Sequence, residues 1–275
     1  MCPNCRAFIT TDDKKCEYCG VTLAARAIDL RMPDDLLGGL LPGQRFLTTL
    51  LVMVCSGLYV ATIVYSMKAG NPRALTDIDG RTLIAFGGKF GPAMLAGQWW
   101  RLVTAGFLHG GIMHIMFNMW SLLDVGANAE ELYGASRMWV IFVVSTITGF
   151  WLSHWWRPMG LSIGASAGLF GLMGAMFAHG VKWQRTAHGE AIKTVYYRAL
   201  MYGIIASLLM PMIDMGAHVG GLAGGFAVGW LAGEPNKSVA ADRVWDWAAR
   251  GALVVVVLSF FRAVTFLLPT LLAAD

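Results

Sequence analysis

Long apolar runs are the feature that most constrains how this chain can fold. A bilayer core about 30 Å thick is crossed by a helix of roughly 20 apolar residues, and most of the runs have about that length. A lipid-exposed segment must satisfy its own backbone N–H and C=O groups, so each run predicts a helix. We therefore predict an all-α polytopic membrane protein. The predicted spans are 46–67, 103–123, 137–156, 161–181, 199–213, 217–233 and 250–272.

The composition supports this class. Hydrophobic residues make up 56% of the 275 positions and charged residues only 14%, whereas soluble domains average about 25% charged. The 11 Trp fit interfacial aromatic belts, and the 33 Gly fit close helix packing in lipid. The net charge of +4 is small and no basic run stands out, so we expect no nucleic-acid partner.

The distribution of Lys and Arg predicts the orientation. With a cytoplasmic N-terminus, the short outer loops hold Arg157 and little else, whereas the inner loops are basic. The loop 68–101 is the exception, but it is long, and we expect it to lie in the outer interface. The predicted location is a cell membrane, taken as a bacterial inner membrane, with the C-terminus outside. The inner-loop basic residues are Arg137, Lys182, Arg185, Lys193, Arg198, Lys237, Arg243 and Arg250.

Two Cys-x-x-Cys pairs predict a metal site at the N-terminus. Four thiolates at this spacing suit tetrahedral Zn²⁺, and metal binding would supply the folding energy of so short a segment. Two disulfides are the alternative, which a reducing cytoplasm disfavours. We expect a zinc-ribbon-like segment at 1–24 and a linker at 25–44, with structural Zn²⁺ and a surface for a cytoplasmic partner. The ligands would be Cys2, Cys5, Cys16 and Cys19.

Ionisable and polar residues inside apolar runs usually mark function, and one group lies in "FLHGGIMHIMFNMWSL". His109 begins the group. His114 and Asn118 are four residues apart, so they share one helical face. Two donors on one face can stabilise an oxyanion, and the alternative is hydrogen bonding between helices.

The stretch "GASAGLFGLMGA" contains a second candidate, Ser166. A serine at the start of a helix gains from exposed N–H groups and the positive helix end. The alternative is a packing face of small residues, because Gly164 and Gly168 are four apart, as are Gly171 and Ala175. A soluble hydrolase elbow needs a strand before the serine, and none is expected in this run.

The third candidate is His218, one turn before a glycine stripe that contains Gly221 and Gly225. Such a stripe can pack against the small-residue face of the Ser166 helix. Close contact would let the imidazole reach the hydroxyl, and histidine is the usual base for a serine nucleophile. No buried carboxylate is placed to orient the base, so a Ser–His dyad is the simplest interpretation.

Taken together, these stretches resemble the rhomboid family of intramembrane serine proteases over about residues 45–235. "GQWWRLVTAGFLHGGIMHIMFNMWSL" follows the family's W-R … H-x4-H-x3-N pattern. "GASAGLFG" is similar to its G-x-S-G-x-x-F-G segment, and "AHVGGLAGG" to its A-H-x-x-G-x-x-x-G segment. The G-x3-E-x3-G pattern appears as Gly126, Glu130 and Gly134.

The resemblance implies a six-helix core at 45–235, then a linker and a seventh transmembrane helix at 236–275. It implies Ser166 as nucleophile, His218 as base, and an oxyanion site of His114, Asn118 and the Ser166 N–H. Ala167 stands where the family usually has glycine; an added methyl group can crowd an oxyanion pocket, but alanine is small, so activity is expected to survive. The residues expected to line or support the cavity are His109, Trp100, Arg101, Glu130, Gly164, Gly221 and Gly225.

The predicted function is cleavage of transmembrane segments that contain helix-destabilising residues, with no cofactor for catalysis. One alternative is a catalytically silent member of the same fold that binds membrane proteins for quality control. Another is a transporter or channel, which would need a polar path across the membrane. The polar residues lie toward one end of their spans, which disfavours that path.

Overall fold

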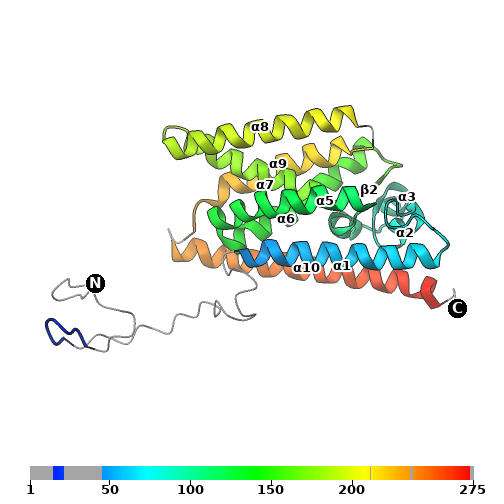
Figure 1. Ribbon diagram of the computed structural model, residues 1–275, viewed down its shortest axis with the longest axis horizontal. Coiled ribbons are helices and arrows are strands. Elements are labelled where there is room, and N and C mark those ends of the chain that lie inside the picture. The colour runs from blue at the N-terminus through cyan, green and yellow to red at the C-terminus, as the bar shows by residue number, and fades with distance from the viewer. Residues whose placement is uncertain (1–14, 22–44, 211, 236–237, 273–275) are drawn as a thin grey trace. The chain divides into compact units, whose positions relative to one another are not determined.

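The computed structural model describes residues 15–21, 45–210, 212–235 and 238–272 (Figure 1). The chain divides into two compact units, 1–43 and 44–275, and the second holds the helices and strands that the structure describes. Their bounds are α1 Phe46–Lys68, α2 Gly80–Ala85, β1 Lys89–Phe90, α3 Gly91–Leu95, α4 Arg101–Thr104, η2 Ala105–Phe107, α5 Ile112–Ser121, η3 Leu122–Gly126, α6 Ala127–Trp156, β2 Leu161–Ser162, α7 Ser166–Lys182, α8 Ala187–Leu209, α9 Met215–Ala232 and α10 Val239–Leu272.

Several of these helices are apolar enough for a bilayer. Within the described residues, three helical stretches have the length and composition to cross a membrane: Phe46–Lys68, Ile112–Trp156 and Val239–Leu267. The middle stretch is interrupted at Gly134, whose φ of 75° and ψ of 160° are not helical. A positive φ is readily adopted only by glycine, so the chain changes direction there without strain.

The predicted span 103–123 is wrong as a single helix. Helix α4 ends at Thr104, η2 ends at Phe107, and α5 begins only at Ile112. The break is held by the preceding loop, because Ile78 N donates to Gly110 O at 2.8 Å and Ile112 N donates to Leu75 O at 3.2 Å. Hydropathy could not reveal these long-range backbone contacts.

The predicted span 199–213 is also misplaced. Helix α8 begins at Ala187 and ends at Leu209. Its first turns are polar, with a Thr186 side chain that accepts from Gly189 N at 3.0 Å and a Lys193–Glu190 ion pair. N-capping and ion pairs favour helix where hydropathy predicts none.

The long loop after α1 docks on the connection between α6 and α7. Strands β1 and β2 pair antiparallel, with Lys89 opposite Ser162. The fully buried Lys89 donates from Nζ to Ser153 O, Arg157 O and Gly160 O at 3.1, 2.9 and 3.3 Å. Ser153 O belongs to the last turn of α6 and the other two carbonyls follow its end, where a cation is favoured by the helix dipole.

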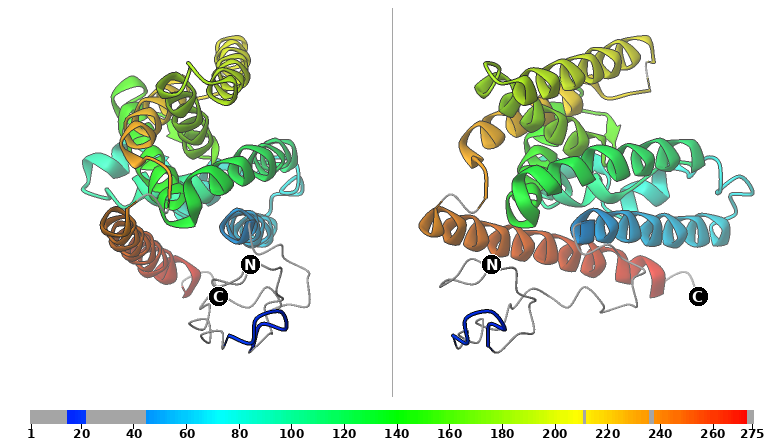
Figure 2. Two further views of the ribbon diagram at one scale, coloured as in Figure 1. Left: turned by 90° about the vertical axis from the view of Figure 1, so that its left-hand side faces the viewer. Right: turned by 60° about the vertical axis from the view of Figure 1, so that its left-hand side comes forward.

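Helices α6, α7 and α9 form the core, and α7 lies beside α9 (Figure 2). The contact is made through backbone. A Cβ placed on Gly221 would lie 2.1 Å from Ala167 O, and one on Gly225 would lie 2.0 Å from Gly171 O. The predicted packing of the glycine stripe on the small-residue face is therefore confirmed for Gly171 and Ala175, whereas Gly168 meets Phe142 of α6.

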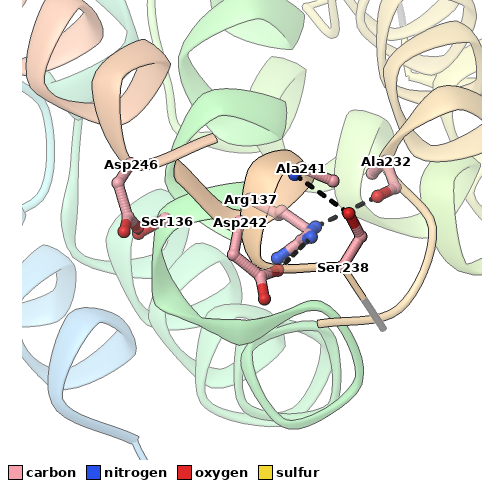
Figure 3. Close-up of polar contacts among 7 residues, drawn as sticks. All are labelled: Ser136, Arg137, Ala232, Ser238, Ala241, Asp242 and Asp246. Carbon is pink, nitrogen blue, oxygen red and sulfur yellow. Dashed lines mark hydrogen bonds and ion pairs between the residues drawn. The ribbon is translucent and has the colours of Figure 1, made fainter. Parts of the chain in front are cut away.

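Helix α10 is fastened to the core at both ends. Near its start, Arg137 Nη2 contacts Asp242 Oδ1 at 2.6 Å and Ser136 Oγ donates to Asp246 Oδ1 at 2.6 Å (Figure 3). Arg137 Nε also donates to Ala232 O at 3.0 Å, which ties the end of α9 to the same point. Farther along, the ring of Phe260 packs on Phe107, with 5.3 Å between centroids.

Candidate functional site

Ser166 is the first residue of α7. The chain reaches it through Gly164, whose φ of 123° favours glycine, and Gly164 N donates to Ala105 O at 2.9 Å. The first N–H groups of a helix have no intrahelical acceptor. The Ser166 side chain therefore lies at the positive end of α7, as the sequence predicts.

His114 lies beside Ser166 across Gly164. A Cβ on Gly164 would come within 2.7 Å of His114 Nε2 and 3.6 Å of Ser166 Oγ. His114 Nδ1 accepts from Gly110 N at 3.4 Å, so the proton of a neutral imidazole is on Nε2. The Nε2–H donor thus faces the space next to the serine hydroxyl, and any side chain at Gly164 would fill that space.

Asn118 and His109 flank His114. Asn118 Nδ2 donates to His114 O at 2.8 Å, one turn along α5, and this leaves its second N–H available. His109 is fully buried, and its ring centroid lies 5.1 Å from that of His114. The three predicted polar residues of this stretch are therefore one cluster at the start of α5.

His218 lies in the first turn of α9 and is buried. Its ring stacks on Phe170 with centroids 4.0 Å apart and planes 16° from parallel. Phe170 is one turn after Ser166 on α7, so the imidazole lies alongside the serine-bearing turn. Within the described residues no hydrogen bond joins Ser166 to His218, and catalytic hydrogen bonds often tighten only when substrate binds.

Two residues around His218 were missed by the sequence analysis. Ser207 Oγ, on α8, lies 2.7 Å from His218 Nδ1. Ser207 is a polar residue in an apolar run, and this is a sequence signal for a functional role. Phe170 belongs to a quoted motif, but the pattern alone gave it no role.

Ala167 packs in a helix interface. It is fully buried between helices, and a Cβ on Gly149 of α6 would come within 2.8 Å of the Ala167 methyl group. The methyl group of Ala167 therefore packs on Gly149 in the helix interface, and its effect on an oxyanion site stays a prediction.

Trp100 and Arg101 brace the long loop that follows α1. Arg101 is fully buried, and its Nη1 donates to Ile84 O at 2.6 Å and to Gly88 O at 2.8 Å. Its guanidinium lies over the Trp100 ring, 4.6 Å from the centroid. These contacts fix the loop that closes over the end of the bundle.

Glu130 lies far from the serine. It caps the start of α1, where Oε1 accepts from Leu47 N at 2.9 Å and Oε2 accepts from Thr48 N at 2.8 Å and from Thr48 Oγ1 at 2.7 Å. From His114 to Glu130 the chain runs along a nearly continuous helix, about 24 Å at 1.5 Å per residue. The G-x3-E-x3-G motif therefore organises the start of α1 and does not line the site.

Asp214 holds the start of α9. Its side chain accepts from Ala217 N at 3.2 Å and from Ser153 Oγ. Burial acts to raise the pKa of Asp214, but hydrogen bonds from Ser153, Ser162 and Ala217, with the charge of Lys89, lower it overall. Burial lowers the pKa of Lys89 to about 8, partly opposed by Asp214. Asp214 is thus ionised at neutral pH.

The second cysteine pair forms a turn. Gly20 N donates to Cys16 O at 2.8 Å, and Cys16 N donates to Val21 O at 3.0 Å. The φ of 67° at Gly20 suits glycine. Cys2 and Cys5 lie outside the described residues, so the finding that the described part holds no cluster of metal-ligand residues does not bear on the predicted ribbon.

A serine and histidines are residue types that acyl transfer uses, and comparison with known proteins identifies the family. The Rhomboid domain matches residues 96–235, just over half of the chain. The chain therefore belongs to the rhomboid family. Together with its apolar helices, this makes it a multi-pass membrane protein.

Known proteins with similar sequences include proteases. Rhomboid protease GluP of Bacillus subtilis is 33% identical over 174 residues, which are 63% of this chain and 34% of GluP. Rhomboid-like protease 3 of Toxoplasma gondii is 34% identical over 154 residues, 54% of this chain and 57% of that protein. RHOMBOID-like protein 4 of Arabidopsis thaliana is 33% identical over 134 residues, 48% of this chain and 34% of that protein. The chain spans between a third and three fifths of these relatives.

Proposed function

We propose that this protein is a serine-type intramembrane endopeptidase in which Ser166 is the nucleophile and His218 the general base. The observation that supports this most is the arrangement at the start of α7: a serine at the positive helix end, His114 Nε2 beside it across Gly164, and an imidazole stacked one turn away. Packing alone does not require two histidines around one serine.

In the proposed reaction, Ser166 Oγ attacks a substrate carbonyl while its proton passes to His218 Nε2. The oxyanion accepts hydrogen bonds from His114 Nε2 and the Ser166 N–H, with the free Asn118 N–H as a third donor. The protonated imidazole gives its proton to the leaving amine as the peptide bond breaks. A water molecule, deprotonated by His218, then hydrolyses the acyl-enzyme.

The proposed substrates are transmembrane segments with Gly or Pro near the cleavage site and a small residue before it. A helix hides its carbonyls in hydrogen bonds, so such residues lower the cost of unwinding. We also propose the six-plus-one arrangement, with α10 as the additional helix, an N-terminus in the cytoplasm, and a bacterial inner membrane as the location.

The N-terminal cysteines are proposed to bind one structural Zn²⁺ and to offer a surface to a cytoplasmic partner. The turn at Cys16–Gly20 supports this, because it is the kind of tight turn that presents two thiolates together. Elemental analysis of the full chain should find about one zinc per protein, and less after Cys16→Ser. A wild-type protein without zinc would refute the ribbon.

Cleavage tests the main proposal. The full chain in lipid vesicles is mixed with a single-span substrate that has a Gly-rich segment. Wild type should cleave it, whereas Ser166→Ala and His218→Ala should lose cleavage by about 10³-fold or more. The exposed Ser238→Ala and His188→Ala variants serve as matched controls. Equal cleavage by Ser166→Ala would sink the proposal. Binding without cleavage by wild type would favour a catalytically silent member.

A further inference from the structure

We propose that Ser207 is a positioning residue that fixes the tautomer of His218, so that Nε2 is the basic nitrogen available to Ser166. The inference rests on the proposed protease function and extends the dyad to a third helix. It is carried by the 2.7 Å contact between Ser207 Oγ and His218 Nδ1, for which neither packing nor the sequence motifs give another reason.

The chain reversal between α8 and α9 brings the two residues together. Ser207 lies in the last turn of α8, which ends at Leu209, and His218 lies in the first turn of α9, which begins at Met215. Both side chains are buried, with 5% and 6% of their residue surfaces exposed. Water therefore cannot readily replace either partner.

The protons around Ser207 can be counted. Its Oγ also lies 2.7 Å from Gly203 O, the carbonyl four residues earlier on α8. A hydroxyl has one proton to donate and two lone pairs that accept. If that proton goes to Gly203 O, Ser207 can only accept from His218, and the imidazole proton must be on Nδ1.

The opposite arrangement satisfies fewer groups. If Ser207 donated to Nδ1, the bond to Gly203 O would be lost and His218 would carry its proton on Nε2. That tautomer cannot accept a proton from Ser166. The buried hydrogen-bond pattern therefore favours the catalytic tautomer, in the role that a buried carboxylate has in serine proteases with a triad. Phe170 holds the plane of the ring, and Ser207 sets which nitrogen is protonated.

Kinetics in lipid vesicles test the role. Ser207→Ala should lower kcat roughly three- to tenfold, the effect of losing one neutral hydrogen bond, with KM within about twofold. Ser207→Thr keeps the hydroxyl and should recover most of the loss. Ser259→Ala is the matched control, because buried Ser259 makes the same bond to the carbonyl four residues earlier, Val255 O at 2.7 Å, with no histidine beside it. A Ser207→Ala kcat within twofold of wild type would overturn the role.

Nuclear magnetic resonance of the full chain with isotope-labelled histidine gives a readout that needs no cleavage. The His218 signals are identified by their loss in His218→Ala. At a pH where the imidazole is neutral, wild type should show the proton on Nδ1, and Ser207→Ala should show a mixture of tautomers. A wild-type Nε2–H tautomer would overturn the inference. If wild type fails to cleave yet shows the Nδ1–H form that depends on Ser207, the protease proposal fails and the positioning inference stands.

Discussion

The two ends of the helical bundle are held together in different ways. Around Ser166 and His218, helices α7 and α9 touch through glycine backbone, so that a single added Cβ would meet a carbonyl oxygen at about 2 Å. At the start of α1 and α10, buried charged side chains, Glu130 and Arg137, tie helix ends together. Backbone contact fixes the separation of two helices to within a methyl group, whereas a long side chain tolerates small shifts. Ser166 and His218 lie on the two helices that touch through backbone.

The largest effect should come from breaking the backbone contact. Gly225→Ala places a Cβ 2.0 Å from Gly171 O, which neither helix can avoid by a rotamer change. We expect a loss of about 3 kcal/mol in stability, at the upper end of overpacking, with cleavage largely lost because α9 moves His218 away. Thermal unfolding in detergent and cleavage of the test substrate measure both.

Gly57→Ala in α1 is the matched control. Its Cβ would have nothing within 4 Å, so the substitution should be neutral or stabilise the helix by up to about 1 kcal/mol. If Gly225→Ala behaves like Gly57→Ala, the glycine contact does not set the position of α9.

An intermediate effect on stability is expected from removing Glu130, at the start of α1. Glu130→Ala leaves the N–H groups of Leu47 and Thr48 without their carboxylate acceptor and should cost about 2–3 kcal/mol. Cleavage by the molecules that remain folded should change little, because Glu130 is far from Ser166. Glu131→Ala removes the same charge from the exposed neighbour and should stay within about 0.5 kcal/mol of wild type. A selective loss of kcat in Glu130→Ala, with stability unchanged, would contradict the division between the two ends.

The smallest effect should appear with acid. The folded pKa of Asp214 lies below its ordinary value of 3.8, so ionisation of Asp214 stabilises the fold above that value. The stabilisation is lost as pH falls through the folded pKa. Asp214→Asn keeps a good N-cap at neutral pH but removes this titration. The free energy of unfolding of wild type and Asp214→Asn is measured with denaturant from pH 7 to pH 3. The difference between the two proteins should shrink as the pH falls, and a constant difference would contradict stabilisation by ionised Asp214.

Much of the candidate site can be predicted from the sequence, because residues three or four apart share one helix face. His114 with Asn118, and the stripe with Gly221 and Gly225, follow from the helical period alone. The small residues on both helices predict that the Gly221 stripe packs against the Ser166 helix, and the structure confirms this contact.

What the sequence could not reveal depends on contacts between distant segments. Ser207 meets His218 only because α8 and α9 reverse over a short connection. The break before α5 depends on two backbone hydrogen bonds, from Ile78 N to Gly110 O and from Ile112 N to Leu75 O. The buried face of Ala167 depends on Gly149 of another helix. Each is set by tertiary packing that hydropathy and spacing do not encode.

Covalent labelling of Ser166 by a fluorophosphonate tests the central claim most directly, because it needs no knowledge of the substrate. Peptide mapping by mass spectrometry of the full chain in lipid should find one adduct, on Ser166, and none on the Ser166→Ala variant. Labelling of His218→Ala should be at least about 100-fold slower, the usual contribution of a general base. An adduct on another serine, or equal labelling rates in wild type and His218→Ala, would contradict a nucleophile activated across the α7–α9 contact.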